Sequence, residues 1–470
     1  MRRHVRSRRR KAMLGKALGR REWAWSGRKL LTTIGELQRK LEAQLPGERE
    51  RIQHARKERG HEVAASVSVA QVLGGMRDIP SLVSDISELK ADEGIRYRGR
   101  PLHELRSSLA SPSSEPTSES VLWLLLVGEA PSQEQERALA RDLKQREQSL
   151  VQSSNRPELN IVDNMASEGS HPMSQLSAAL LSLQRFSSFS RAYNEGVHKQ
   201  SLWEYALEDG LNLLASVPDV ASHVYKCTYN GTGGLPREEA DRPDDWASRF
   251  ARGLGLHSNA ATNYMRLYAF LHCEHQVGNA STHASYLISS TLADPYLAMS
   301  AAVNALAGPL HGLANQEVLS FIDEKPNGMS MREHAKKTMA SGRVIPGYGH
   351  GALRCEDPRF TIQRQFAREN DLIWKNDKVQ QAEAMYQEVP EFLRSTGKVA
   401  NPQPNTDAMS GSILSALGLR ERTYYTAVFA VARSIGVVAQ VVQARKLGLP
   451  IERPRSVTLE ELLSEAEAKR

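Results

Sequence analysis

The sequence predicts a predominantly α-helical protein with one large domain or two. Hydrophobic residues make up 40% and charged residues 24% of the 470-residue chain, a balance typical of globular proteins that bury a large core. Apolar residues recur at the helical spacing i, i+4, i+7, as in Leu176, Leu180 and Leu183. Segments that alternate polar and apolar residues are scarce, and the best strand candidate, residues 94–102, is short. Together these observations favour an all-α fold.

Residues 1–30 form a strongly basic leader. They hold 12 Lys and Arg against one acid, a net charge of +11, and since the whole chain carries +7, residues 31–470 carry −4. The leader is rich in Arg, contains apolar side chains such as Trp23 and Trp25, and lacks a long apolar core. This pattern predicts a mitochondrial transit peptide, and hence the mitochondrial matrix, rather than secretion. A plain basic tail is the alternative, and no nucleic-acid partner is expected because no nucleic-acid-binding module follows.

The cysteines, the apolar runs and the polar clusters of the sequence indicate which further features to expect. No two cysteines have the CxxC spacing of a structural zinc site, so neither zinc nor a disulfide framework is predicted for Cys227, Cys273 and Cys355. No long uncharged apolar run of membrane-spanning composition occurs, and no membrane span is predicted. Clusters of Ser, Pro, Gly and acidic residues predict exposed loops at 107–120, 228–246 and 323–330.

The segment 423–444 predicts a buried helix. Arg433 is its only charged residue, and a helix that is apolar nearly all round lies in a large core or in a membrane. A cation at mid-span argues against the membrane. Inside a core, the guanidinium needs a partner that the segment itself does not supply. A buried ion pair with a distant acid and a fork that binds the carboxylate of a ligand are both open alternatives.

Three further polar residues stand in unusual settings. His311 lies in the nearly uncharged segment 304–318, between two glycines. His350 lies in a glycine-rich segment that is a weak match to a phosphate-binding loop, so a simple turn is its default interpretation. Asp407 precedes a helical stretch, where its ordinary task is to cap the helix.

The segment 271–283 suggests a metal site only weakly. His272 and His275 are spaced i, i+3 with Cys273 between them, but adjacent residues point to different helix faces and no second ligand cluster is evident. No metal is predicted there.

Several motifs together carry a resemblance to a known family. The segments "ADPYLAMSAAVNALAGPLHGLANQEVLSFI", "SGRVIPGYGHGALRCEDPRFTIQRQFA" and "NPQPNTDAMSGSIL" with its continuation to Thr458 resemble the eukaryotic mitochondrial type of citrate synthase. The shorter segments "LGGMRDIPSLV", "DEGIRYRG", "HPMSQLSAAL" and "SRAYNEGVH" extend the similarity, which covers roughly residues 37–460.

The resemblance implies a fold and an activity. The fold is an all-α homodimer in which a large helical domain, residues 31–306 and 413–470, carries a smaller mobile helical domain, residues 307–412. The activity is that of an acyltransferase of the tricarboxylic acid cycle, which condenses acetyl-CoA with oxaloacetate and water to give citrate and CoA. No cofactor is implied, because acetyl-CoA is a substrate.

The resemblance also implies roles for particular residues. Asp407 would remove a proton from the acetyl methyl group, while His311 would donate a hydrogen bond to the thioester carbonyl. The uncharged setting of His311 would lower its pKa by desolvation and keep the ring neutral. His350 would hydrogen-bond the oxaloacetate carbonyl and protonate the alkoxide.

Further residues would bind the two substrates. The oxaloacetate residues implied are His275, Arg359, Arg433 and, from the other subunit, Arg453. The CoA residues implied are Arg77, Arg191, Val344, Gly347, Gly349, Arg354 and Lys398.

The sequence departs from the family pattern near these positions. Gln276 and Val277 replace an acid and a glycine beside His275, Met409 replaces a His, Ala400 a Lys, and Cys355 a Lys. Two other functions are weighed: 2-methylcitrate synthase acting on propionyl-CoA, since one methylene is worth only ~1–3 kcal/mol of discrimination, and a scaffold or assembly subunit of the same fold.

Overall fold

The computed structural model describes residues 33–110, 115–151, 156–230 and 245–467, and helices dominate them. The predicted all-α fold is confirmed. The leader, residues 1–30, and most of the predicted loop 228–246 lie outside the described residues.

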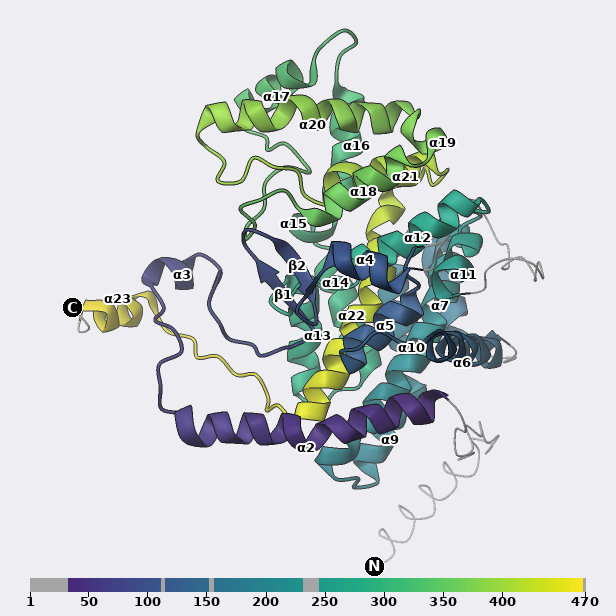
Figure 1. Cartoon of the computed structure of the whole chain (residues 1–470), viewed down its shortest axis with the longest axis vertical. Coiled ribbons are helices and arrows are strands. Elements are labelled where there is room, and N and C mark those ends of the chain that lie inside the picture. Colours follow the sequence, from purple (N-terminus) through teal and green to yellow (C-terminus); the bar gives the residue numbers. More distant parts are fainter. Residues whose placement is uncertain (1–32, 111–114, 152–155, 231–244, 468–470) are drawn as a thin grey trace, which may run out of the picture.

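Most helices gather in the larger part of the molecule, in the middle and lower part of Figure 1. Those before residue 310 are α2 (Thr33–Arg59), α3 (Val69–Leu73), α4 (Leu102–Leu109), α5 (Ser118–Val127), α6 (Gln133–Val151), α7 (Pro157–Ser167), α8 (Pro172–Ser182), η1 (Leu183–Phe186), α9 (Ser188–Asn194), η2 (Lys199–Ser201), α10 (Leu202–Tyr225), the π-helical turn η3 (Lys226–Asn230), α11 (Trp246–Gly253), α12 (Asn259–His272), α13 (Ala280–Ser290), α14 (Pro295–Leu306) and the short α15 (Pro309–Gly312). The face predicted from Leu176, Leu180 and Leu183 is buried, on α8 and the start of η1.

A second group of helices lies at the upper end of Figure 1. It comprises α16 (Ala314–Glu324), α17 (Met331–Ala340), α18 (Pro358–Arg368), α19 (Asp371–Trp374), α20 (Asp377–Thr396) and α21 (Asp407–Ala416). These helices pack mainly on one another, with α21 touching α16, α18, α19 and α20. The chain then returns to the larger part through η4 (Arg422–Tyr424) and α22 (Tyr425–Leu447), and ends in α23 (Leu459–Glu467).

Helix α22 forms the centre of the core, as the sequence predicts. Every residue of α22 is buried, and the helix packs against α10, α12, α13 and α14. Each buried Val or Ile contributes about 1.5–3 kcal/mol of transfer free energy. Gly436 lets α22 approach the end of α12, because a Cβ there would lie 2.1 Å from the carbonyl oxygen of Cys273. Arg422–Leu447 is long and apolar enough by composition to cross a membrane, but it is wholly buried inside the protein.

A small antiparallel sheet braces the end of α12. Its strands are β1 (Ser87–Lys90), β2 (Gly94–Tyr97) and β3 (Arg100–Pro101), in the order β1-β2-β3. The strand predicted at 94–102 is confirmed in part, because the chain turns between β2 and β3, which pair antiparallel, and Leu102 begins α4. Ser87 faces Tyr97 in the register. The Ser87 hydroxyl donates to Glu274 Oε1 at 3.2 Å, and the Tyr97 hydroxyl lies 3.2 Å from the Glu274 carbonyl oxygen. Both contacts hold the residue that precedes His275.

The loop prediction for residues 107–120 is partly wrong. Helix α5 begins at Ser118, and Ser118, Glu119 and Ser120 are buried. Glu119 is buried because its carboxylate accepts a hydrogen bond from the backbone N–H of Trp246 at 2.9 Å. The polar residues 118–120 therefore lie in the core, and the partner of Glu119 is more than a hundred residues away in the sequence. The loop predicted at 323–330 is present between α16 and α17.

Candidate active site

Six of the polar residues predicted to act together surround one cavity. The cavity has a volume of about 130 Å³, enough for a small molecule and far too little for a coenzyme. It lies where α15, α18, α21 and α22 meet the loops after α12 and α17. The predicted residues that line it are His275, His311, His350, Arg359, Asp407 and Arg433, and the others are Asn279, Asn405, Thr406 and Phe429.

His311 is held as a neutral ring with a defined tautomer. Its Nε2 accepts a hydrogen bond from the backbone N–H of Ser281 at 3.3 Å and lies 3.0 Å from the Ser281 hydroxyl. The proton of the neutral ring is therefore on Nδ1. Burial, and next the charge of Arg433, lower the pKa of His311 to about 4. The predicted lowering of this pKa is confirmed.

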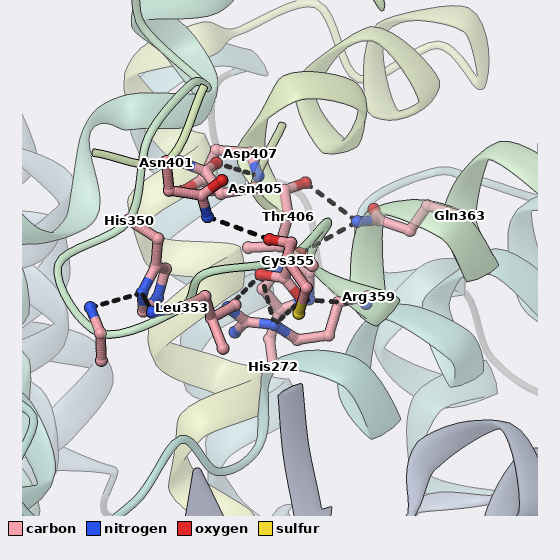
Figure 2. Close-up of polar contacts among 12 residues, drawn as sticks. His272, His350, Leu353, Cys355, Arg359, Gln363, Asn401, Asn405, Thr406 and Asp407 are labelled. Carbon is pink, nitrogen blue, oxygen red and sulfur yellow. Dashed lines mark hydrogen bonds and ion pairs between the residues drawn. The ribbon is translucent and has the colours of Figure 1, made fainter. Parts of the chain in front are cut away.

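His350 is fixed in the opposite tautomer by its own turn. Its Nδ1 accepts hydrogen bonds from the backbone N–H groups of Ala352 and Leu353, both at 3.0 Å (Figure 2). The neutral ring therefore carries its proton on Nε2. Burial, and next the charge of Arg359, lower the pKa of His350 to about 4. Both imidazoles are thus hydrogen-bond donors without charge at neutral pH.

The turn that carries His350 is fastened to the segment before Asp407. The backbone N–H of Gly349 donates to the Gln403 carbonyl at 3.1 Å, and that of Asn405 donates to the Gly347 carbonyl at 2.9 Å. Gly347 has φ +79°, and a Cβ there would lie 2.8 Å from Cα of Ala408. Only glycine fits both requirements at this position.

Asp407 does not cap its helix. It is the first residue of α21, the N-cap is Thr406, and no side-chain cap bond forms, so the capping interpretation is wrong. Its own backbone N–H donates to Asn405 Oδ1 at 3.0 Å. Burial raises the pKa of Asp407 to about 6, against the lowering effect of Arg359. The carboxylate is therefore ionised at neutral pH and more basic than an ordinary Asp.

A buried network holds the backbone that precedes Asp407 (Figure 2). Gln363 donates through Nε2 to the Thr406 carbonyl at 2.9 Å, and the Thr406 hydroxyl lies 3.0 Å from His272 Nε2. His272 Nδ1 in turn lies 3.0 Å from the Tyr268 carbonyl oxygen. Both nitrogens of the His272 ring are therefore engaged by protein groups, and Cys273 Sγ donates to the Phe270 carbonyl at 3.4 Å.

Arg433 has no carboxylate partner among the described residues. Its Nε donates to the His272 carbonyl at 2.9 Å, and one terminal nitrogen donates to Asn279 Oδ1 at 2.8 Å and lies 3.2 Å from the Ser281 hydroxyl. All three acceptors are neutral, and burial lowers the pKa of Arg433 against the raising effect of the nearby Glu274 carboxylate, which makes no direct ion pair with it. The ion-pair alternative is therefore wrong, and the guanidinium faces a cavity that suits an anion.

Arg359 is the second guanidinium of the cavity, and it is paired. Its Nε lies 3.0 Å from Asp357 Oδ1, and a terminal nitrogen donates to Asp357 Oδ2 at 2.7 Å. Asp357 is also the N-cap of α18. The pair fixes the direction of the Arg359 side chain at the cavity wall.

His275 offers the cavity an unused ring nitrogen. Its Nε2 is buried and has no hydrogen-bond partner in the described part of the chain. The ring centroid lies 5.3 Å from that of His350. Burial, and next the charge of Arg359, lower the pKa of His275 well below its ordinary value. A buried polar atom without a partner at a cavity wall is suited to a ligand.

The other predicted residues do not line this cavity. Gly347 and Gly349 shape the His350 turn. The exposed ones are Arg77, Arg191, Val344, Arg354, Lys398 and Arg453. Arg453 lies between α22 and α23 and does not line the cavity.

Sequence reasoning missed several residues that orient the site. Asn279 caps α13 and also accepts from Arg433, Ser281 contacts both His311 and Arg433, and Asp357 pairs with Arg359. The only local signal was a helix-capping pattern, Asn before "ASTH" and Asp before "PRF". Capping predicts a helix start and says nothing about a guanidinium from a distant helix.

The departures from the family pattern are accommodated locally. Gln276 adopts a left-handed φ of +61°, and its backbone N–H donates to the Ser87 hydroxyl at 2.9 Å. Val277 is buried in a small apolar cluster with Tyr286 and Ala444. Met409 is fully buried, whereas Ala400 is exposed and Cys355 is half-buried.

Comparisons with known proteins agree with this geometry. A family profile described as "Citrate synthase, C-terminal domain" matches residues 75–455. A probable mitochondrial citrate synthase of Glossina morsitans morsitans is 42% identical over 433 residues, which cover 90% of this chain and 91% of that protein. Citrate synthase 4, mitochondrial, of Arabidopsis thaliana is 41% identical, with coverage of 90% and 89%.

Solved structures show the same fold. The citrate synthase of Pyrobaculum aerophilum superposes with a TM-score of 0.68 at 25% identity, over 83% of this chain and 95% of that chain. The citrate synthase of Thermoplasma acidophilum, solved as a ternary complex with carboxymethyl coenzyme A and oxaloacetate, has a TM-score of 0.68 at 22% identity, over 84% and 97%. With the profile covering most of the chain and relatives above 40% identity over nine-tenths of it, the chain belongs to the citrate synthase family.

Proposed function

We propose that the protein condenses acetyl-CoA with oxaloacetate and water to give citrate and CoA, without a cofactor. The observation that carries this proposal is one small cavity in which two guanidiniums, three neutral imidazoles and a carboxylate with a raised pKa converge. Carbon–carbon bond formation from a thioester needs a base at the methyl group, donors at both carbonyl oxygens and cations for a dicarboxylate. The cavity contains each of these groups.

The first step is enolisation of the thioester. Asp407 removes a proton from the acetyl methyl group, and His311 donates its Nδ1–H to the thioester oxygen as negative charge develops there. A base with a pKa of about 6 is ionised at neutral pH yet stronger than an ordinary Asp. A neutral donor matches the weak acidity of the enol better than an imidazolium would.

The second step forms the carbon–carbon bond. The enol carbon attacks the ketone carbon of oxaloacetate, whose oxygen accepts a hydrogen bond from Nε2–H of His350. As the carbonyl π bond breaks and negative charge develops on this oxygen, it takes that proton and becomes the hydroxyl of the product. The product is citryl-CoA, and water then cleaves its thioester to release CoA. The hydrogen bonds from Ala352 and Leu353 support this role because they leave Nε2 as the protonated nitrogen.

Oxaloacetate is bound by His275, Arg359 and Arg433. Arg433, whose direct hydrogen-bond partners are neutral, pairs with one carboxylate, and the free Nε2 of His275 hydrogen-bonds the substrate. Arg77, Arg191, Arg354 and Lys398 contact the CoA phosphates, and the turn from Val344 to Gly349 contacts the adenine. The cavity is too small to enclose CoA, so most of the coenzyme must bind at the surface, where these side chains are exposed.

The protein acts as a homodimer in which Arg453 completes the partner's site. Helices α3 and α23 lie side by side and project from the body (Figure 1). Leu73 of α3, Met76 just after it, and Leu459 and Leu463 of α23 are exposed apolar side chains. An apolar surface of this kind is typical of a subunit interface.

Residues 307–412 act as the smaller, mobile domain. The grouping of α16 to α21 at one end of the molecule supports this division (Figure 1). The cavity draws His350, Arg359 and Asp407 from this unit, and His275 and Arg433 from the other. An anion that bridges the two guanidiniums would therefore favour the closed arrangement.

The leader directs the protein to the mitochondrial matrix. Its charge of +11 supports import, and the named relatives are mitochondrial. Deletion of residues 2–30 should abolish import into isolated mitochondria and leave the turnover of the purified enzyme unchanged. Continued uptake of the truncated chain would contradict the targeting role.

The deciding experiment is an assay of oxaloacetate-dependent CoA release with acetyl-CoA and with propionyl-CoA side by side. We expect CoA release only when both oxaloacetate and an acyl-CoA are present, and faster release from acetyl-CoA than from propionyl-CoA. Equal or faster turnover of propionyl-CoA would favour 2-methylcitrate synthase. No release with either substrate would favour a scaffold role.

A further inference from the structure

A second cluster of chemically reactive side chains lies outside the cavity. Asp163 on α7, His223 near the end of α10 and Cys227 in the π-helical turn η3 bring one ligand atom each to a common point. Asp163 Oδ1 lies 2.8 Å from His223 Nε2 and 3.3 Å from Cys227 Sγ, and Sγ lies 3.4 Å from Nε2. None of the three lines the cavity described above.

The local structure explains why these atoms converge. His223 and Cys227 are four residues apart, so they lie on the same face of the helix. The π-helical turn widens the backbone at Lys226–Asn230, a distortion that frequently accompanies functional sites. Helix α7 packs against both α10 and η3. This packing brings Asp163 within contact of His223 and Cys227.

The geometry is that of a chelate and not of a catalytic relay. In a relay, the two nitrogens of the imidazole contact different partners, the nucleophile on one side and the acid on the other. Here the same nitrogen, Nε2, faces both Asp163 and Cys227. Burial, and next the hydrogen bond to Asp163, raise the pKa of Cys227 to about 11, so the thiol is not an activated nucleophile.

We propose that Asp163, His223 and Cys227 form a binding site for a zinc ion. A thiolate, an imidazole and a carboxylate are the ligand types of Zn²⁺, whereas Mg²⁺ and Ca²⁺ prefer oxygen alone. Tetrahedral zinc separates nitrogen and oxygen ligands by about 3.3 Å and sulfur from either by about 3.6 Å. To fit, the triangle needs to open by about 0.5 Å at its nitrogen–oxygen edge and by about 0.2–0.3 Å at its two sulfur edges.

The site is accessible, and zinc would enter with loss of one proton. The side chains of His223 and Asp163 are 20% and 46% exposed, so a hydrated ion can reach them and keep water as the fourth ligand. Binding replaces the S–H proton of Cys227, which goes to solvent, and the cation then compensates the thiolate and the carboxylate. No oxidation or reduction takes place.

A zinc ion bound by these three residues would link α7 to η3 and stabilise their packing. The residues around the turn also hold the segment before α22: the Tyr225 hydroxyl donates to Glu421 at 2.6 Å, and the Tyr229 hydroxyl lies 2.6 Å from that of Thr423. An ion that binds the folded form alone stabilises it by mass action.

The test uses the full chain after removal of metal with a chelator. Titration with Co²⁺, a spectroscopic stand-in for Zn²⁺, should produce a sulfur-to-cobalt charge-transfer band that saturates at one ion per chain, and Zn²⁺ should abolish it. Zn²⁺ should raise Tm and release one proton per ion in calorimetry performed in two buffers.

Matched variants assign the signal to the three residues. Cys227→Ser should remove the charge-transfer band, and Asp163→Asn and His223→Ala should weaken Zn²⁺ binding by roughly tenfold or more. Cys355→Ser and His54→Ala, which change a half-buried cysteine and an exposed histidine elsewhere, should bind as the parent does. Circular dichroism confirms that each variant is folded. Absence of the band in the parent chain, or its persistence in Cys227→Ser, would overturn the proposal.

Discussion

The Nε2 atom of His311 accepts a hydrogen bond from the backbone N–H of Ser281, 3.3 Å away. This single contact determines which face of the ring is available to a substrate, because the proton of the neutral imidazole must then be on Nδ1. The same contact disfavours the imidazolium, which would place a second proton where Nε2 already accepts one. Burial, and next the charge of Arg433, lower the pKa of the ring to about 4, so the neutral tautomer that Ser281 selects is the form present at neutral pH.

The pH profile of kcat/KM should fall on the acid side at about pH 6. Asp407 must be ionised to act as a base, its pKa is raised to about 6, and protonation below that value removes the base. His311 and His350 do not limit the rate in this range, because their lowered pKa values of about 4 keep them neutral. Initial rates from about pH 5 to about pH 8 at constant ionic strength test this. An acid limb near pH 4 would contradict the assignment.

Asp407→Asn should lower kcat by ~100-fold or more. The amide has nearly the same shape, and because the carboxylate makes no cap bond, Tm should be unchanged or higher. Asp377→Asn is the matched control, since Asp377 is likewise the first residue of its helix, α20, but is exposed. Near-normal turnover of the Asp407 variant would exclude it as the base.

Gly347→Ala should destabilise the protein by ~1–3 kcal/mol and lower turnover with it. The residue has φ +79°, and the added Cβ would collide with Ala408, directly after Asp407. Gly351→Ala, four residues on, meets nothing within 4 Å and should unfold as the parent does. Chemical denaturation and steady-state kinetics measure both effects. Equal stability of the two variants would show that the turn tolerates a side chain.

Mixed dimers test whether Arg453 acts in the partner's site. His311→Ala and Arg453→Ala homodimers should each be nearly inactive. After the two are unfolded, mixed and refolded, a hybrid dimer has one site with an intact His311 and a borrowed Arg453. Since half of the dimers are hybrids with one working site each, roughly a quarter of the parent activity should return.

The outcome separates three roles for Arg453. No recovery despite confirmed mixing would mean that Arg453 serves its own subunit. Full activity of the Arg453→Ala homodimer would mean that it is a surface charge, as its exposed position would suggest by itself.

Sequence alone predicted the parts of the fold that local patterns determine. The helix at 423–444 and the face of Leu176, Leu180 and Leu183 depend on periodicity, and both are confirmed. Glu119 was assigned to a loop because its neighbours are polar, and its burial depends on the backbone of Trp246. Local composition carries no information about such a distant partner.

The same limit applies to the two sites. The sequence of its helix did not show which groups Arg433 contacts. Its partners are Asn279 and the His272 carbonyl, about 150 residues earlier in the chain. Cysteine spacing predicted no zinc, and spacing rules detect ligands only when they are close in sequence. Asp163 lies 60 residues before His223, so only the packing of α7 on α10 reveals the cluster.

The attachment of the His350 turn to the segment before Asp407 has a mechanical consequence. The two residues form one cassette, because the backbone bonds of Gly347 and Gly349 tie their segments together. Any rotation of the upper helices relative to α22 therefore carries the proton acceptor and the proton donor as a pair, with their separation preserved. Such motion changes the distance from the cassette to His275 and Arg433, which lie in the other part of the molecule, while the spacing of the acid and the base stays the same.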